Sequence, residues 1–241
     1  MPEIHNGAAS SRPDSLLPFV SSLQLADSLF PTGLYTLSHG IESYAQAGLI
    51  DEQTLPALIA EMIQHSIGRS DAIALVCAYR GARDADLDLV ERADTRLTAV
   101  KLTAESRRAS HRTGRQMLAM GADLLQSEFI ESYQQRVKDR ALPGNHAVAM
   151  GLIKSEMQID VVHAVAGELY SFAASCAGAA LRMSLIDHWQ AQRVVNEVKP
   201  IIAAVSPTLE NCDVRDIAGS VPLSETMSMK HEEAEVRLFV S

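Results

Sequence analysis

Residues 160–183, DVVHAVAGELYSFAASCAGAALRM, carry the strongest signal for the fold of this chain. Their apolar side chains recur at alternating spacings of three and four, which is the spacing of one face of an α-helix. These side chains are Val162, Val165, Leu169, Phe172, Cys176, Ala179 and Met183. Alanines and glycines between them would let neighbouring helices approach closely. We therefore expect a core helix over residues 160–183, and its small residues also leave open a seam between two subunits.

Helical signals also cover most of the chain outside this segment. Apolar residues recur at helical intervals between residues that start helices, such as Asp, Ser and Thr, and residues that break them, such as Pro and Gly. The expected helices span residues 16–29, 54–67, 71–82, 84–100, 103–125 and 189–204, and a loop at 142–145 leads into another at His146. Strand alternation, hairpin signals and sequence repeats are not visible. The sequence therefore predicts an all-α fold, a single helical bundle of roughly ten helices.

The two ends of the chain differ from the middle in composition. Residues 1–15 are rich in Ser, Pro and Asn, so we expect a flexible N-terminal tail. Gly219 and Pro222 break regular structure, so a C-terminal tail over residues 219–241 should follow the all-helical domain of residues 16–218.

The C-terminal tail contains the sequence LSETMSMKHEEAEVRLFVS, residues 223–241. In a helix, one face of it would be lined by Met227, His231, Ala234 and Leu238, and Phe239 adds apolar bulk near the end. Such an apolar anchor either folds back onto the domain or inserts into a groove on a partner. The sequence leaves both interpretations open.

Composition and charge disfavour several classes of function. Hydrophobic residues make up 47% of the chain, which is too many for a disordered protein. A formal net charge of −9 disfavours binding to nucleic-acid phosphates and suits a basic protein partner. The three cysteines are widely spaced, and neither a secretory leader nor an apolar run of about 18 residues appears. We expect a cytoplasmic protein that binds no nucleic acid and no membrane.

Motifs for catalysis or permanent metal binding are missing from the sequence. The chain lacks a Walker A loop, a GxSxG elbow and a GxGxxG turn. Its histidines stand singly, without the HxH or HExxH spacing of zinc sites. We therefore expect a protein that is not an enzyme, and we assign no catalytic residue, no metal ligand and no tightly bound cofactor.

A basic set on one expected helix has two interpretations. Arg108, Arg112 and Arg115 share a helix face, four and three residues apart. They could meet an acidic partner, or they could form a solvated face paired with nearby carboxylates. The nearby carboxylates are Glu91, Asp94 and Glu105. We favour the solvated face, because charge runs are usually solvated.

Residues 30–49, FPTGLYTLSHGIESYAQAGL, combine a turn with a polar helical run. Pro31 and Gly33 predict a sharp break in the chain. Apolar residues then recur at helical spacing, at Leu34, Leu37, Ile41 and Tyr44. Gly40 would cost about 1 kcal/mol relative to Ala inside a helix, so we expect a close contact there.

Five blocks of this sequence, taken in order, resemble the urease accessory protein F (UreF) family. The blocks are the Pro-Thr-Gly turn with Ser38-His-Gly-Ile-Glu42; Asp94 and Leu97 with Glu105-Ser-Arg-Arg-Ala-Ser and Gly114-Arg-Gln-Met-Leu; His146-Ala-Val-Ala-Met-Gly; Ala180-Leu-Arg182; and Ser228-Met-Lys-His-Glu232 with Arg237-Leu-Phe239 and Ser241. The chain departs from the family pattern at Gly33-Leu-Tyr35 and at Leu185-Ile-Asp-His-Trp-Gln190, where the family usually has a second Gly with an aromatic and a Pro-Leu-Gly-Gln run.

The resemblance implies an all-helical, homodimeric and non-catalytic scaffold. Such a protein would bridge UreD (called UreH in some organisms) and the GTPase UreG for nickel insertion into apo-urease. It implies partner-binding residues at both ends of the chain, with a helix over residues 35–42 as a second surface. These residues are Tyr35, Ser38, His39, Glu42, Met229, Lys230, His231, Glu232, Arg237, Leu238 and Phe239. Transient nickel handling at His39, His146 or His231 stays open.

Two other classes of function remain beside the scaffold. One is a regulator of GTP hydrolysis by the partner GTPase, with Arg108 or Arg112 donating charge to the transition state. The other is a helical metal-dependent enzyme with a scattered His/Glu centre.

Overall fold

The computed structural model describes residues 16–27, 29–31, 33, 36–233 and 238–239. Over these ranges the chain forms eleven α-helices and no strand, which confirms the predicted all-α bundle. The helices are α1 (Leu17–Ala26), α2 (Ile41–Gln46), α3 (Leu55–Met62), α4 (Asp71–Arg83), α5 (Leu87–Val100), α6 (Ala104–Leu125), α7 (Glu128–Lys138), α8 (His146–Glu156), α9 (Val161–Arg182), α10 (His188–Val205) and α11 (Pro222–Glu233). A π-helical turn extends α3 over Ile63–Ile67, and two 3-10 turns lie at Ser206–Leu209 and Val214–Asp216. The predicted flexible tail at residues 1–15 lies outside the described residues.

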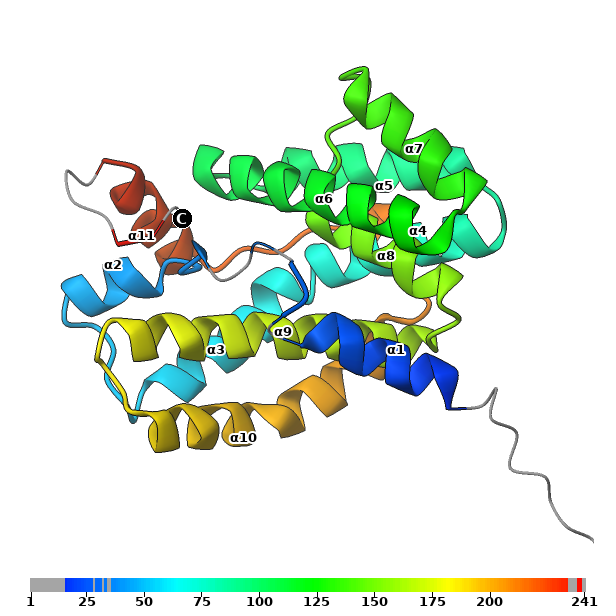
Figure 1. Cartoon of the computed structure of the whole chain (residues 1–241). Coiled ribbons are helices and arrows are strands. Elements are labelled where there is room, and N and C mark those ends of the chain that lie inside the picture. The colour runs from blue at the N-terminus through cyan, green and yellow to red at the C-terminus, as the bar shows by residue number, and fades with distance from the viewer. Residues whose placement is uncertain (1–15, 28, 32, 34–35, 234–237, 240–241) are drawn as a thin grey trace, which may run out of the picture.

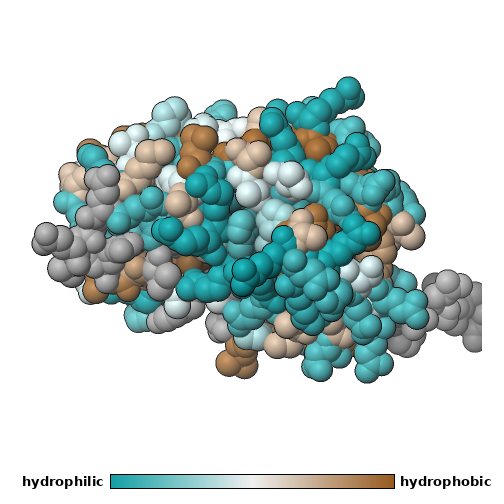
Figure 2. Space-filling model, turned by 90° about the horizontal axis from the view of Figure 1, so that it is seen from above, coloured by the Kyte–Doolittle hydropathy of each residue, from teal (hydrophilic) through white to brown (hydrophobic). Residues whose placement is uncertain are grey.

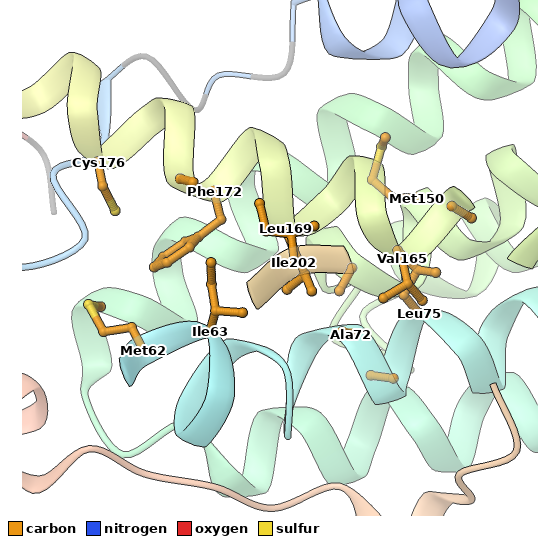
Figure 3. Close-up of a cluster of buried hydrophobic side chains, with 14 of the residues drawn as sticks. Met62, Ile63, Ala72, Leu75, Met150, Val165, Leu169, Phe172, Cys176 and Ile202 are labelled. Atoms are coloured by element: carbon orange, nitrogen blue, oxygen red, sulfur yellow. The ribbon is translucent and has the colours of Figure 1, made fainter. Parts of the chain in front are cut away.

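The predicted core helix is α9, which runs through the middle of the bundle. It contacts α10, α4, α8, α2 and α1, with α3 and α10 on one side and α4, α5, α6 and α8 on the other (Figure 1). Its buried apolar residues Val165, Leu169 and Phe172 meet Ile63 and Ile202 from neighbouring elements (Figure 3). α9 is long and apolar enough to cross a membrane by length and composition alone, a test that core helices also pass. Here it serves as the central packing helix.

Glycine permits two close helix contacts around α8. A Cβ on Gly114 of α6 would overlap the carbonyl oxygen of Gly144 and lie 2.6 Å from the carbonyl carbon of Asn145. A Cβ on Gly151 of α8 would lie 2.5 Å from the carbonyl oxygen of Leu75 in α4. Glycine is therefore required at both positions by backbone contact, which explains why these motif residues carry no side chain.

Asp94 of α5 fixes the loop that begins α8. Its fully buried carboxylate accepts hydrogen bonds from the Tyr133 hydroxyl (2.6 Å), the Gly144 N–H (2.8 Å), the Asn145 N–H (2.9 Å) and the Asn145 side-chain amide (2.7 Å). A buried carboxylate is stable only when such donors replace water. Asp94 thus ties α5, α7 and the start of α8 together.

The structure adds one helix that the sequence analysis omitted. α7 begins after Ser127, whose hydroxyl oxygen accepts a hydrogen bond from the Ile130 N–H. The helix buries Ile130, Tyr133 and Val137. The spacing of three and four between these residues is helical. The signal was therefore present, although two Glu and three Gln or Arg residues around it dilute the apolar pattern.

Viewed from the side of α6 and α7, the surface is mainly hydrophilic with scattered apolar patches (Figure 2).

Candidate functional site

The turn before α2 differs from the helix expected over residues 35–42. α2 begins only at Ile41, because His39 (φ 52°) and Gly40 (φ 83°) take left-handed conformations that a right-handed helix cannot include. The expectation of a helix through Ser38–Gly40 was therefore wrong. Gly40 is present for its backbone conformation at the helix N-terminus, and a Cβ there would meet nothing closer than 4.0 Å. Tyr35 lies outside the described residues.

The turn directs the His39 side chain inward. Its Nε2 lies 3.2 Å from the Ser175 hydroxyl of α9, and its ring stands edge-on to Phe172 at 4.9 Å between centroids. Burial, with a smaller contribution from Lys101, lowers the pKa of His39 to about 4. The imidazole is therefore neutral near pH 7.

The described part of the C-terminal tail folds back onto the domain. α11 packs against α2 and α6 at the end of the bundle where the chain terminates (Figure 1). The Tyr44 hydroxyl of α2 lies 2.9 Å from the Ser224 hydroxyl of α11, and Met227 is buried. Of the predicted apolar face, Met227 and His231 face inward, Leu238 is exposed, and Ala234 lies outside the described residues.

His231 connects three helices through two carboxylates. Its Nε2 lies 3.0 Å from Glu42 Oε2 of α2, and its Nδ1 lies 2.9 Å and 3.0 Å from the two Glu105 oxygens of α6. The three side chains are between 1% and 4% exposed. We call these three residues, His231, Glu42 and Glu105, the tail latch. Two sequence-predicted site residues therefore meet, together with Glu105, for which no site role was predicted.

The tail latch also holds the last described residues. Glu42 accepts the backbone N–H groups of Leu238 (2.9 Å) and Phe239 (3.2 Å). Phe239 is buried, and the Arg182 guanidinium of α9 lies over its ring at 4.8 Å. Glu232 accepts the N–H of Glu105 in the first turn of α6.

Other predicted site residues face solvent or lie outside the described ranges. Met229 is 46% exposed, Leu238 is 72% exposed, and Lys230 is exposed. Ser38 is buried beside His39. Arg237 lies outside the described residues. The geometry thus divides the predicted site into a buried set that holds the tail and an exposed set that a partner could reach.

A cavity of about 160 Å³ with both apolar and polar lining residues lies beneath α11. Its lining includes Ser224, Glu225 and Ser228 from α11, with His39 and His146 opposite. No group of three His, Cys, Asp or Glu side chains among the described residues has metal-binding geometry.

An ion pair missed by the sequence analysis includes Glu168, which lines this cavity. Glu168 of α9 pairs with Lys154 of α8 at 2.8 Å and lies 3.4 Å from His146 Nε2, and all three are buried. Burial alone would raise the pKa of Glu168, but Lys154 and His146 hold it well below its usual range. A lysine and a glutamate on otherwise apolar helix faces were the sequence signals for this pair.

The basic stripe on α6 is solvated, but its expected partners are taken. Arg108, Arg112 and Arg115 are exposed and form no ion pair with a described residue. The expected pairing was wrong because each carboxylate bonds elsewhere. Glu91 pairs with Arg136, Asp94 binds the loop before α8, and Glu105 binds His231.

Sequence comparisons place the chain among urease accessory proteins. Residues 49–199 match the profile of the UreF family. The protein named urease accessory protein UreF of Trichodesmium erythraeum (strain IMS101) is 30% identical over 224 residues, covering 91% of this chain and 95% of the relative. UreF of Lachnoclostridium phytofermentans is also 30% identical, covering 91% and 96%. UreF 2 of Brucella canis is 28% identical, covering 96% of each chain.

These relatives span nearly all of the chain. The family resemblance inferred from five sequence blocks is therefore confirmed. The chain belongs to the UreF family of urease accessory proteins.

Proposed function

We propose that this chain is a non-catalytic scaffold that bridges UreD (UreH) and the GTPase UreG while nickel is inserted into apo-urease. The observation that carries this proposal is the convergence of the two terminal sequence blocks. Glu42 from the first block and His231 from the last lie in direct contact, and the exposed side of α11 lies above them. Blocks that are distant in sequence thus pack together beneath α11, whose outer side is the surface that a partner could reach.

The exposed side of the tail supplies apolar anchors for UreD. Leu223, Met229 and Leu238 are each about half exposed or more, with Lys230 beside them. Leu102 is also exposed, next to Thr103, which accepts a hydrogen bond from Ser228 of α11. Apolar anchors with a charged rim are typical of binding hot spots. His231 and Phe239 support this surface from beneath, because both are buried in the chain itself.

The same proposal covers oligomeric state, cargo and location. A homodimer could bury the outer face of α1, where Leu17, Phe19, Val20 and Leu23 are all more than half exposed. Nickel is cargo in this scheme, so a tightly bound cofactor is not required, and transient contact with His39 or His146 would suffice. The partners act in the cytoplasm, and neither nucleic acid nor a membrane is involved.

Co-expression of the chain with UreD, followed by size-exclusion chromatography with light scattering, tests the proposal. A stable complex with two copies of each chain is expected. Leu238→Ala and Met229→Ala should each weaken UreD binding by about 1–3 kcal/mol, a hot-spot amount, without changing the thermal unfolding of the chain. Leu124→Ala, at the opposite end of α6, removes another exposed leucine and should leave binding unchanged. A Kd that neither tail variant alters would reject the tail as the UreD surface, and absence of any complex would reject the scaffold.

A second candidate function rests on the basic stripe of α6. Arg108, Arg112 and Arg115 are exposed without a described carboxylate partner, so they are available to an acidic surface or to a phosphate. We propose regulation of GTP hydrolysis as the alternative role. It requires that the chain accelerate hydrolysis by UreG and that Arg112→Ala abolish the acceleration. A rate of hydrolysis that the chain does not change would exclude this role. A helical metal-dependent enzyme would instead require turnover by the chain alone.

A further inference from the structure

The cavity beneath α11 is large enough to hold a small molecule. Its volume of about 160 Å³ is close to the roughly 150 Å³ of a protein cavity that admits benzene. Met62 of α3 and Phe172 of α9, both labelled in Figure 3, contribute apolar side chains to its lining. Leu37, Ile67 and Val100 also line it. A ligand with an apolar body would therefore find contacts in this cavity.

The hydroxyl groups of the cavity wall favour a ligand that donates hydrogen bonds. Six of these hydroxyls each have an acceptor of the chain itself within 3.2 Å, so their own hydrogens are already used. They belong to Ser70, Thr103, Ser106, Ser110, Thr113 and Ser228. A hydroxyl has one hydrogen but two lone pairs, so most of these oxygens can still accept a hydrogen bond.

One carboxylate of the cavity wall, that of Glu225 on α11, lacks a counter-charge. The other two are paired, Asp71 with Lys101 at 2.8 Å and Glu168 with Lys154 at 2.8 Å. The Glu225 side chain forms neither a hydrogen bond nor an ion pair with a described residue. Burial raises the pKa of this carboxyl, and the Lys101 ammonium opposes the effect only in part. A bound cation would supply the charge that Glu225 lacks.

We propose that this cavity binds a small organic ammonium ion with an apolar body. The N–H groups of such an ion pair with Glu225 and donate to the wall hydroxyls, while its carbon atoms lie against Met62 and Phe172. A metal ion fits less well, because no group of three His, Cys, Asp or Glu side chains among the described residues has metal-binding geometry. An anion would meet Glu225 with like charge. This inference goes beyond the proposed function, since it needs only the chain itself.

Binding of n-butylammonium to the full chain at about pH 7 tests the site. NMR of isotope-labelled methionine methyl groups locates the binding, because Met62 lines the cavity whereas Met229 is exposed on α11 and does not line it. We expect the Met62 signal to shift with a Kd on the order of 1 mM, since a ligand this small gains only a limited free energy, and the Met229 signal to stay in place. The absence of a Met62 shift would overturn the proposal.

An uncharged compound of the same size tests the need for positive charge. 1-Butanol replaces the ammonium group by a hydroxyl, so it loses the charged hydrogen bond to Glu225 and should bind at least about tenfold more weakly. Equal dissociation constants for the two compounds would show an apolar cavity without preference for a cation and would overturn the proposal.

Three variants separate the charge of the site from its volume. Glu225→Gln keeps the size of the side chain but removes its charge, so n-butylammonium should bind only as weakly as 1-butanol. Glu131→Gln removes an exposed charge on α7, which does not line the cavity, and should leave both dissociation constants unchanged. Ala109→Leu enlarges a side chain of the cavity wall and should abolish binding of both compounds. Unchanged n-butylammonium binding in Glu225→Gln, or an equal loss in Glu131→Gln, would overturn the proposal.

Discussion

His231 Nε2 lies 3.0 Å from Glu42 Oε2, although 189 positions separate the two residues, and both side chains are 1% exposed. A buried charged group of this kind needs its protein partner, because water does not reach the site and cannot take the partner's place. His231→Ala would remove the ring that lies between the Glu42 and Glu105 carboxylates. We expect a loss of about 3–5 kcal/mol, or of the whole docking free energy of α11 if that is smaller.

Hydrogen exchange over residues 222–233, together with urea unfolding, measures this loss. Met229→Ala, on the exposed side of the same helix, should change stability by less than about 0.5 kcal/mol. Unchanged protection of α11 in His231→Ala would show that the tail is held by other contacts.

The buried pair of Glu168 and Lys154 predicts a second large effect. Glu168→Gln leaves the Lys154 ammonium buried without a counter-charge, with neutral oxygens such as the Ala164 carbonyl (3.0 Å) as its partners, so the free energy of unfolding should fall by about 3–5 kcal/mol. Because the folded pKa of Glu168 lies below its unfolded value of about 4.3, its contribution is full above that pH and is lost as the pH falls. Chemical unfolding between about pH 3 and pH 7 should show this loss in the wild type and not in Glu168→Gln. Glu156→Gln, exposed on α8, serves as the control.

His39 should behave as a neutral histidine throughout the physiological range. Its pKa of about 4 in the folded chain lies below the ordinary 6.5, so the unfolded chain binds this proton first. Stability from His39 is therefore full above about pH 6.5 and decreases as the pH falls toward 4. NMR titration should show a flat His39 ring signal from about pH 8 to pH 5, the range in which an ordinary imidazole gains its proton. A His39 midpoint near the ordinary 6.5 would contradict the buried site. His39→Asn, which tolerates the left-handed backbone, should remove this part of the pH dependence.

Two glycine substitutions with opposite expected effects test the close contact between α6 and the loop before α8. Gly114→Ala places a Cβ against the backbone of Gly144 and Asn145, which cannot move aside as a side chain could, so we expect a loss of about 3 kcal/mol or more. Gly167→Ala, within α9, meets nothing within 4 Å and should stabilise the chain by up to about 1 kcal/mol through helix propensity. Thermal unfolding of both variants measures the difference. Equal effects would mean that α6 and the loop separate more easily than their contact indicates.

Local patterns predicted most of the fold, because helix periodicity and caps are encoded within a few residues. The helices expected over residues 103–125 and 160–183, for example, are α6 and α9, which Thr103 and Asp160 cap. The turn at His39–Gly40 was misread as helix, since a glycine ending a left-handed turn resembles a glycine inside a helix when only spacing is considered. The pairing of Glu105 with His231 spans 126 positions and leaves no local trace. The sequence therefore named His231 and Glu42 through family resemblance, but it could not show that they meet or that Phe239 points inward.

The contacts of Glu42 with the tail can form only after the C-terminal part of the chain has been synthesised. The ribosome makes Glu42 189 positions before the first of its imidazole and backbone amide partners, which are His231, Leu238 and Phe239. The pocket around Glu42 therefore stays incomplete on every nascent chain that has not yet reached Phe239. Synthesis must pass the whole helical bundle before the residues that fix α11 in place can bind Glu42, so the surface that α11 presents forms after the bundle itself has been made.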